Sequence, residues 1–436
     1  MVAAVLGGGG PVYAVDDPTL SATIIDGSRA YTPTQLFAAY RDQLGQPIND
    51  SSARTILAQI EALYRQDGYS LPEFRVAEYA SAGGILRIEV FEAQLTRVAF
   101  TGDSGPYAAR LEELASDLSL RVPLRTDDLQ TALQSMSELP GLTVRATTRR
   151  DEARHNAYAL AIASEYKPFD ASLQLSNRGT RDLGPMFLCN EVAANGIVGH
   201  GERLGAFVSA ATDTDEYRGG GLFVEMPVSS FGWWAAFERH DLDTEKVRVL
   251  ELGASLTRGA TTANQYGVGL RVRRGLDAFG SELDTPENFL ITRLQFTELR
   301  HFAERWSVRL DAFGQHSAYV LPEVERYRLA DERRGRGFEV GEIAGDQGLG
   351  AKAELRREMS GAATALGKTS LYGFYDFAAA WKQDMPGRES AATAGIGFAV
   401  EYWRFSGFLE IAKPLTHADI EGDRDAKVFA EVRLKL

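Results

Sequence analysis

The sequence predicts two small α+β modules followed by an antiparallel transmembrane β-barrel of about 14–16 strands. Three observations predict this fold class. The order strand, helix, helix, strand, strand occurs twice in tandem, over residues 21–94 and 95–166. From residue 167 to residue 436, apolar and polar side chains alternate with a period of two. After the N-terminus there is no window of about 18 consecutive apolar residues, so a helical membrane span is excluded.

The composition is that of a folded, acidic protein. Of the 436 residues, 44% are apolar and 25% are charged, which excludes wholesale disorder. The 60 acidic and 47 basic side chains give a net charge of −13, which argues against a nucleic-acid partner. Cys189 is the one cysteine, so a disulfide within the chain and any site of several thiolates are excluded.

Residues 1–14 are small and apolar, and Val12-Tyr13-Ala14 resembles the small-x-Ala end of a secretory signal. The positively charged start of such a signal is missing, since the first basic residue is Arg29. We interpret residues 1–14 as a truncated signal peptide. A flexible glycine-rich leader is the alternative.

In the first module, Thr23-Ile24-Ile25 predicts a strand and Pro33 opens a helix that ends at Gly45. Asp50-Ser51-Ser52 is expected to cap a second helix, with Ile56, Ile60 and Tyr64 at helical spacing. The closing strands are expected at Arg75–Tyr79 and Ile85–Phe91, joined by a hairpin at Ser81-Ala82-Gly83-Gly84.

The second module repeats this order with a period of about 73 residues. Its elements are expected at Val98-Ala99-Phe100, Pro106–Leu118, Leu129–Leu139 after the cap at Thr126-Asp127-Asp128, Leu142–Thr148 and Tyr158–Ser164. Two such units in tandem resemble POTRA domains, which are periplasmic modules of outer-membrane proteins that handle polypeptides. The resemblance implies a first POTRA domain at residues 21–94 and a second at residues 95–166.

The remaining residues predict about fourteen strands, and sixteen if two short strands are added. The fourteen segments begin near Phe169, Gly184, Glu202, Tyr217, Phe231, Val247, Thr262, Leu290, Glu304, Gly348, Lys368, Ala391, Phe405 and Ala426. A soluble β-sandwich would also alternate. A membrane barrel is favoured by the length of this region, by a polar face rich in Gly, Arg and Glu, and by aromatic residues near segment ends. These aromatic residues are Trp233, Trp234, Trp381, Tyr402 and Trp403.

No motif predicts catalysis or a cofactor. The six histidines lack metal-ligand spacing, and the glycine-rich stretch Gly345–Lys352 lacks the end of a phosphate loop. Gly102–Pro106 resembles a serine-protease nucleophile loop, but the order of the triad fails, and a turn is enough to explain it. Acidic runs such as Asp213–Glu216 are expected to be solvated loops, with calcium binding as the alternative. We therefore expect no enzyme, no metal and no cofactor.

Three further motifs point to a family. They are the junction pattern Leu173–Gly179 with Asn195–Leu204, the triplet Arg336-Gly337-Phe338 followed by Gly345-Asp346-Gln347-Gly348 and Ala353-Glu354-Leu355, and the strand Phe374-Tyr375-Asp376-Phe377-Ala378. From about Ser21 to Leu436, the organisation resembles the two-partner secretion transporters, the haemolysin- and haemagglutinin-activator type of the POTRA-plus-barrel superfamily.

The resemblance implies a long loop, about residues 315–347, that folds back into the barrel lumen and is anchored to the wall. The anchoring residues it implies are Arg336, Gly337, Phe338 and Asp376. Alternation along residues 368–381 places Asp376 on the lumen face, where an arginine could bond it through two oxygens. The alternative is that Arg336 is a solvated residue of a charged loop. The chain departs from the family pattern at Gly335 and Ala378.

The resemblance also implies a function and a location. The POTRA domains would lie in the periplasm and the barrel in the lipid of the outer membrane. They would capture a large unfolded exported partner and pass it to the cell surface. Capture could use β-augmentation near Arg75–Tyr79 or Leu142–Thr148. The alternatives are an assembly factor for other outer-membrane barrels, in the same superfamily, and a membrane-embedded hydrolase or passive porin.

Overall fold

The structure is a computed structural model that describes residues 18–76, 83–119, 121–177, 186–213, 216–228, 230–242, 244–258, 264–282, 287–328, 336, 338, 343–359, 367–416 and 425–436. The proposed signal peptide at residues 1–14 lies outside the described residues, as do Ser81 and Ala82 of the expected hairpin. The described residues form two compact units, one within 1–101, 112–133 and 145–163, and the other within 102–111, 134–144 and 164–436.

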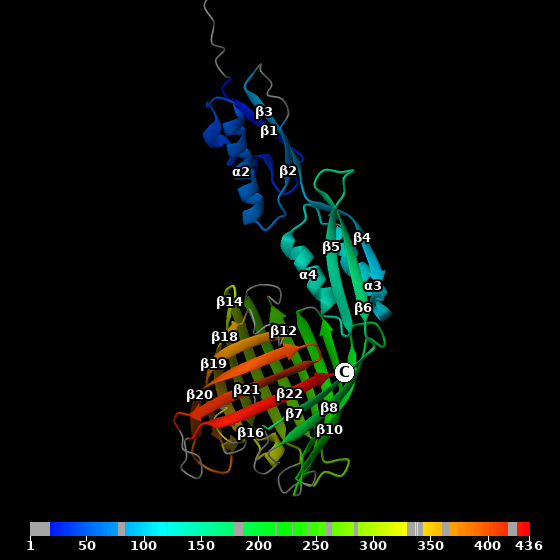
Figure 1. Cartoon of the computed structure of the whole chain (residues 1–436), viewed down its shortest axis with the longest axis vertical. Coiled ribbons are helices and arrows are strands. Elements are labelled where there is room, and N and C mark those ends of the chain that lie inside the picture. The colour runs from blue at the N-terminus through cyan, green and yellow to red at the C-terminus, as the bar shows by residue number, and fades with distance from the viewer. Residues whose placement is uncertain are drawn as a thin grey trace, which may run out of the picture. The chain divides into compact units, whose positions relative to one another are not determined.

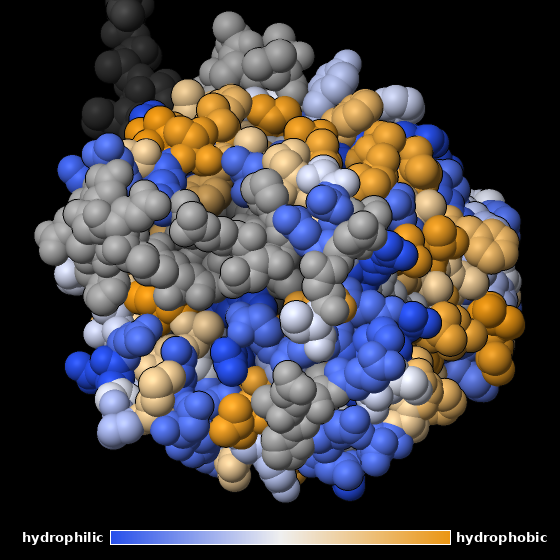
Figure 2. All heavy atoms as spheres, turned by 90° about the horizontal axis from the view of Figure 1, so that it is seen from below, coloured by the Kyte–Doolittle hydropathy of each residue, from blue (hydrophilic) through white to orange (hydrophobic). Residues whose placement is uncertain are grey.

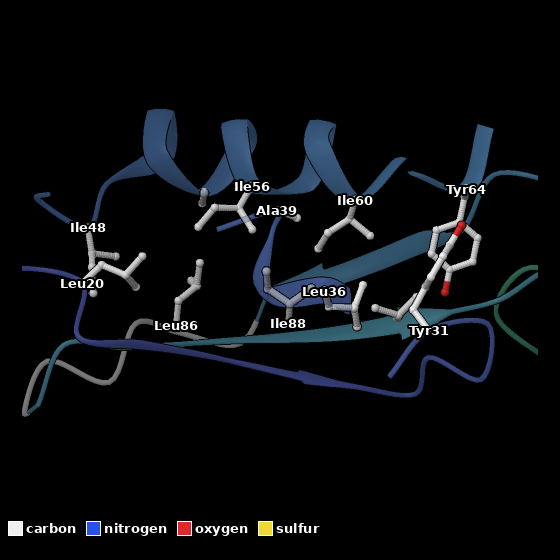
Figure 3. Close-up of a cluster of buried hydrophobic side chains, with 12 residues drawn as sticks. Leu20, Tyr31, Leu36, Ala39, Ile48, Ile56, Ile60, Tyr64, Leu86 and Ile88 are labelled. Atoms are coloured by element: carbon white, nitrogen blue, oxygen red, sulfur yellow. The ribbon is translucent and has the colours of Figure 1, made fainter. Parts of the chain in front are cut away.

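The first module is a three-stranded sheet covered by one long helix. Its elements are β1 (Ala22–Asp26), α1 (Pro33–Phe37), the 3-10 helix η1 (Arg41–Gln43), α2 (Asp50–Gln66), β2 (Glu73–Val76) and β3 (Ile85–Phe91). The strand order is β1-β3-β2, with β1 parallel to β3 and β2 antiparallel to it. Ile56 and Ile60 of α2 pack against Leu86 and Ile88 of β3, and all four are buried (Figure 3).

Two local expectations for this module were wrong. The expected helix from Pro33 to Gly45 is divided into the five-residue α1 and η1, because the backbone leaves helical geometry at Tyr40, where ψ is −6° and φ is −132°. The cap of α2 is Asn49, one residue before the expected Asp50-Ser51-Ser52. Its side-chain oxygen accepts the backbone N–H groups of Ser51 and Ser52 at 2.9 and 3.0 Å, the unpaired donors of a first helical turn.

The second module repeats the arrangement. It consists of β4 (Gln94–Gly102), the 3-10 helix η2 (Gly105–Tyr107), α3 (Ala108–Ser119), α4 (Thr126–Ser137), β5 (Leu142–Arg150) and β6 (Ala157–Tyr166). Its sheet has the order β4-β6-β5, so the strand that arrives last lies in the middle, as β3 does in the first module. Helices and strands of both modules are shown in Figure 1.

The described residues after Tyr166 form a closed antiparallel barrel of fourteen strands (Figure 1). Its strands are β7 (Phe169–Ser176), β8 (Phe187–Asn195), β9 (Arg203–Ala211), β10 (Tyr217–Val228), β11 (Phe231–Leu242), β12 (Lys246–Arg258), β13 (Asn264–Gly275), β14 (Leu290–Ala303), β15 (Trp306–Ser317), β18 (Gln347–Glu358), β19 (Lys368–Trp381), β20 (Glu389–Tyr402), β21 (Phe405–Pro414) and β22 (Lys427–Lys435). The barrel closes where β22 pairs with β7. The predicted fold class is confirmed, with fourteen strands.

Most apolar side chains of the barrel strands point outward, and most polar ones point inward. On β13, Tyr266, Val268, Leu270 and Val272 are exposed. The residues between them are less exposed, and the one that follows Val272, Arg273, is buried. Seen from below in Figure 2, hydrophobic residues gather along the top and right edges of the view, and hydrophilic residues occupy much of the area between. In the described part of the chain, no helix is long and apolar enough to cross a membrane.

We call the barrel end at which β7 begins the proximal end and the opposite end the distal end. Exposed aromatic residues occur at the proximal end, where β11 begins with Phe231 and where Trp403, 81% exposed, joins β20 to β21. These positions fit an interfacial belt. Trp234 was expected among them but faces the lumen, because its neighbour Trp233 takes the outward position of the alternation. Its Nε1–H donates to Glu251 at 2.7 Å.

Candidate functional site

The longest connection of the barrel joins β15 to β18 at the distal end. We call residues 318–346 the lumenal loop. Its described part contains the 3-10 helix η3 (Glu323–Glu325) and two short paired strands, β16 (Tyr327–Arg328) and β17 (Ala344–Gly345). It also contains Arg336 and Phe338, which are 1% and 0% exposed. The loop therefore places a charged side chain in the barrel interior.

Arg336 is bonded to Asp376 of β19 through two parallel hydrogen bonds. Its Nε donates to Oδ2 of Asp376 at 2.8 Å and its Nη2 donates to Oδ1 at 3.0 Å. The backbone N–H of Arg336 donates to the same carboxylate at 3.3 Å. Such charge-assisted, two-point bonds fix both the distance and the plane of the two groups. Of the predicted site residues, the structure therefore brings Arg336 and Asp376 together.

Two further carboxylates surround the Arg336 guanidinium. Nη1 of Arg336 donates to Glu410 of β21 at 2.8 Å and lies 3.6 Å from Glu354 of β18. Glu354 is also paired with Lys352 at 3.3 Å and with Arg356 at 2.8 Å. We call Arg336, Asp376, Glu354 and Glu410 the Arg336 cluster. All four side chains are buried, so the charges are held by one another rather than by water.

An aromatic surface supports this cluster from the wall. The guanidinium carbon of Arg336 lies 3.3 Å from the centroid of the Phe374 ring, in a cation–π contact. Phe374 lies opposite Gly395 in the register of β19 and β20, and a Cβ atom on Gly395 would come within 2.4 Å of its ring. Tyr372 covers Gly397 in the same way. Glycines at these positions allow both rings to lie against the backbone of β20.

Phe338 packs in a separate apolar cluster. It is buried with Tyr327 of β16, Ile343, and the alanines 378, 380 and 391 of β19 and β20. Ala378 is the position at which the chain departs from the family pattern, and its methyl group is part of this cluster. Gly337, predicted with Arg336 and Phe338, lies outside the described residues, as do Gly335 and the charged residues 332–334.

Sequence reasoning did not find Glu410, and it quoted Phe374 and Glu354 within motifs without assigning either of them a role. Each of them lies on the inward face of a strand, which the alternation does show. Nothing in the sequence reveals which inward residues lie near one another, because that depends on the strand register. Tyr372 is an example of a contact that only the register reveals. Its hydroxyl, on β19, donates to Glu410 of β21 at 2.8 Å across β20.

A second group of buried polar residues lies where the chain enters the barrel, in the predicted junction pattern. The Glu202 carboxylate accepts the backbone N–H groups of Val198, Gly199 and His200, the last two at 3.3 and 3.0 Å. Burial raises the pKa of Glu202, but these N–H donors outweigh it and leave the pKa below its ordinary value. Arg178 and Gly179 of the pattern lie outside the described residues.

Asn195 joins the same junction to the strands beside it. Its Nδ2 donates to Asp170 of β7 at 2.8 Å and to the Lys167 carbonyl at 3.2 Å, and its own carbonyl accepts the Tyr166 hydroxyl at 2.5 Å. Gly196, next in sequence, has a φ of +58°, and a Cβ atom there would lie 2.2 Å from the Tyr107 hydroxyl oxygen. The entry to the barrel is thus fixed by buried hydrogen bonds.

Comparisons with known proteins agree with this architecture. Residues 235–400 match the family described as haemolysin secretion/activation protein ShlB/FhaC/HecB. The predicted resemblance to the two-partner secretion transporters is confirmed. The matched range contains the lumenal loop, Arg336 and Asp376. No curated protein sequence matches the chain significantly.

Two solved structures have a similar fold. CdiB from Escherichia coli is 17% identical with a TM-score of 0.70, over 100% of this chain and 93% of that one. CdiB from Acinetobacter baumannii is 13% identical with a TM-score of 0.62, over 98% of this chain and 93% of that one. At these identities the likeness shows the fold. The family match over residues 235–400 supports an outer-membrane transporter of the two-partner secretion type.

Proposed function

We propose that this transporter captures a large exported protein in an unfolded state and passes it through the barrel lumen to the cell surface. The observation that supports this most directly is the Arg336 cluster, in which a loop from the distal end is bonded inside a closed polar barrel. We further propose that Arg336 and Asp376 anchor this loop, with Phe338 packing against β19 and β20.

The lumen provides a path with suitable chemistry. A cavity of about 630 Å³ lies along the inward faces of β8–β15. Its lining mixes the aromatic side chains of Phe207, Phe223 and Trp234 with glutamates and with Arg271 and Arg309. An unfolded segment carries backbone donors and acceptors as well as varied side chains, and such a mixed wall can contact all of these weakly. Weak contacts allow a chain to pass without being held.

For capture, we propose β-augmentation of a module by an extended segment of the partner. The two candidate segments lie on edge strands, since β2 and β5 each pair with one neighbour in their three-stranded sheets. The outer side of an edge strand offers backbone groups for a further strand. Residues 77–79 of the first candidate segment lie outside the described residues. The modules would face the periplasm, and the barrel would contact lipid.

The test is deletion of the gene in the bacterium that encodes it, followed by comparison of the surface and secreted proteins with those of the parent. The proposal predicts the loss of one large exported polypeptide, or very few, with other outer-membrane barrels unchanged. Restoration by the wild-type gene, but not by Asp376→Ala, would link the defect to the anchored loop. A general loss of outer-membrane barrels would instead identify an assembly factor and refute the proposal.

A further inference from the structure

A second arginine in the lumen is also surrounded by three carboxylates. Arg273 of β13 bonds both oxygens of Glu325, which belongs to η3 of the lumenal loop, at 2.9 and 2.7 Å. Arg273 also donates to Glu238 of β11 at 2.8 Å and to Glu251 of β12 at 2.5 Å. We call Arg273, Glu325, Glu238 and Glu251 the Arg273 cluster. Arg273 and Glu325 are 5% and 1% exposed.

The two clusters have opposite polarity. In the Arg336 cluster, the loop supplies the arginine and the wall supplies all three carboxylates. In the Arg273 cluster, the wall supplies the arginine and two carboxylates, and the loop supplies the third. They also lie on different strands, β11–β13 against β18, β19 and β21. The loop is therefore bonded to two parts of the wall by opposite charges.

This difference decides which partners the wall charges keep when the loop residue, Glu325 or Arg336, leaves its cluster. If Glu325 leaves, Arg273 keeps Glu238 and Glu251, and Glu251 keeps the indole N–H of Trp234. If Arg336 leaves, Asp376 loses three hydrogen bonds at once, whereas Glu354 keeps Lys352 and Arg356 and Glu410 keeps the Tyr372 hydroxyl. A buried charge that loses its partner is strongly destabilising, whereas a charge that keeps other partners is not. Opening at Glu325 is therefore the less costly of the two.

We propose that Glu325 is a releasable positioning residue of the loop. The segment around η3 detaches from β13 and β14 while Arg336 stays bonded to Asp376. Because Glu238 and Glu251 also line the 630 Å³ cavity, release of Glu325 frees space at the edge of that cavity. The consequence for transport rests on the proposed function, but the order of release does not.

Other contacts of η3 define the segment that moves. Arg293 of β14 donates to a Glu325 side-chain oxygen at 3.3 Å, and Gln315 of β15 donates to the Glu325 carbonyl at 3.0 Å. Glu323, in the same 3-10 helix, pairs instead with Arg326 and Arg328 of the loop itself. The backbone N–H of Glu323 donates to Glu245, between β11 and β12, at 2.9 Å. The Glu325 side chain therefore bonds the wall and the Glu323 side chain bonds the loop, which provides a matched pair of side-chain substitutions.

The test is amide hydrogen exchange of the full chain in detergent, without any partner, for the wild type, Glu325→Gln and Glu323→Gln. A glutamine at 325 keeps the size of the side chain but not its charge. We expect the amides of residues 321, 325 and 326 to exchange about tenfold faster in Glu325→Gln, since charge-assisted bonds are the stronger class. The amide of Arg336 should keep its wild-type rate, and Glu323→Gln should match the wild type throughout.

Single-channel conductance in planar bilayers gives a second readout, and Glu325→Gln should conduct more than Glu323→Gln. If Glu325→Gln does not fold, Arg293→Gln is used in its place. That substitution removes one of the two arginines that bond Glu325, the other being Arg273, and it leaves the loop sequence intact. Equal exchange in the two glutamate variants would overturn the proposal. So would faster exchange at Arg336 in Glu325→Gln, which would mean that the loop leaves the wall as one piece. Neither result depends on whether a partner is secreted.

Discussion

The Phe374 ring contacts the Arg336 guanidinium and lies against the backbone of Gly395. The guanidinium carbon is 3.3 Å from the ring centroid, and a Cβ atom at position 395 would be 2.4 Å from the ring. The aromatic ring thus contacts both the strand β20 and the loop arginine. The absence of a side chain at Gly395 sets the position of the ring, and the ring sets the depth of the arginine.

Gly395→Ala should therefore disturb the Arg336 cluster without touching any charged group. The added methyl group meets the Phe374 ring and also the Ile411 carbonyl oxygen, at 2.3 Å. Overpacking of this kind costs about 1–3 kcal/mol. We expect a lower temperature for the change in gel mobility that marks barrel unfolding, and reduced secretion. Gly373→Ala is the control, because its nearest heavy atom is 3.9 Å away, and it should behave as the wild type. Equal behaviour of the two variants would contradict this account.

Arg336→Ala and Asp376→Ala should leave a folded barrel that secretes poorly. Each removes one partner of a buried pair, at a cost of about 3–5 kcal/mol, while the ladder of the fourteen strands is unchanged. Arg336→Lys should be closer to Arg336→Ala than to the wild type, because an ammonium group cannot form two parallel bonds to Asp376. Secretion is measured together with heat-dependent gel mobility. Normal secretion by both alanine variants would refute the anchoring role.

Asp346→Asn should loosen the distal base of the lumenal loop. The two oxygens of the Asp346 carboxylate accept the backbone N–H groups of Leu321 and Gln383, each at 2.7 Å. An amide has only one oxygen, so one of these donors loses its acceptor, at a cost of about 1–3 kcal/mol. We expect faster hydrogen exchange at Leu321 or Gln383. The exposed Asp384→Asn should leave both amides unchanged.

Acid should weaken the entry to the barrel through Glu202. The pKa of Glu202 lies below its ordinary value in the folded chain. The contribution of Glu202 to the stability of the folded chain is therefore complete above the ordinary glutamate pKa of about 4.3. It is lost as the pH falls through the lower pKa that Glu202 has in the folded chain. We expect the unfolding temperature to fall over this acidic range, and to fall less in Glu202→Gln. The exposed Glu165→Gln should keep the full pH dependence, and a Glu202→Gln profile parallel to the wild type would argue against this role.

Much of the barrel could be predicted because its pattern is local. Alternating side chains along β13 and β19 reveal both the strand and its two faces, since successive side chains point to opposite sides. The same rule placed Asp376 on the inward face. The capping residue of α2 was missed by one position, because Asn49, Asp50 and Ser51 all suit a helix start and the backbone alone selects among them.

The site could be predicted only where a motif named its residues. Arg336 and Asp376 were found through a family pattern, whereas Glu410 is 74 positions from Arg336 and belongs to no motif. The Arg273 cluster was not foreseen at all. Its members come from three strands and the loop, and they meet only because the register of β11–β13 places their inward residues side by side.

The amino-acid sequence by itself determined the two faces of the strands and the tandem order of the α+β modules, because side-chain periodicity depends only on neighbouring residues. It limited the number of strands to about 14–16, and barrel closure set that number at fourteen. Tertiary structure decided which charged groups share the lumen. Barrel closure and strand register bring distant residues together, and the return of the loop places Glu325 and Arg336 among them. In that space, shielded from water, each buried charge must find a partner of opposite sign.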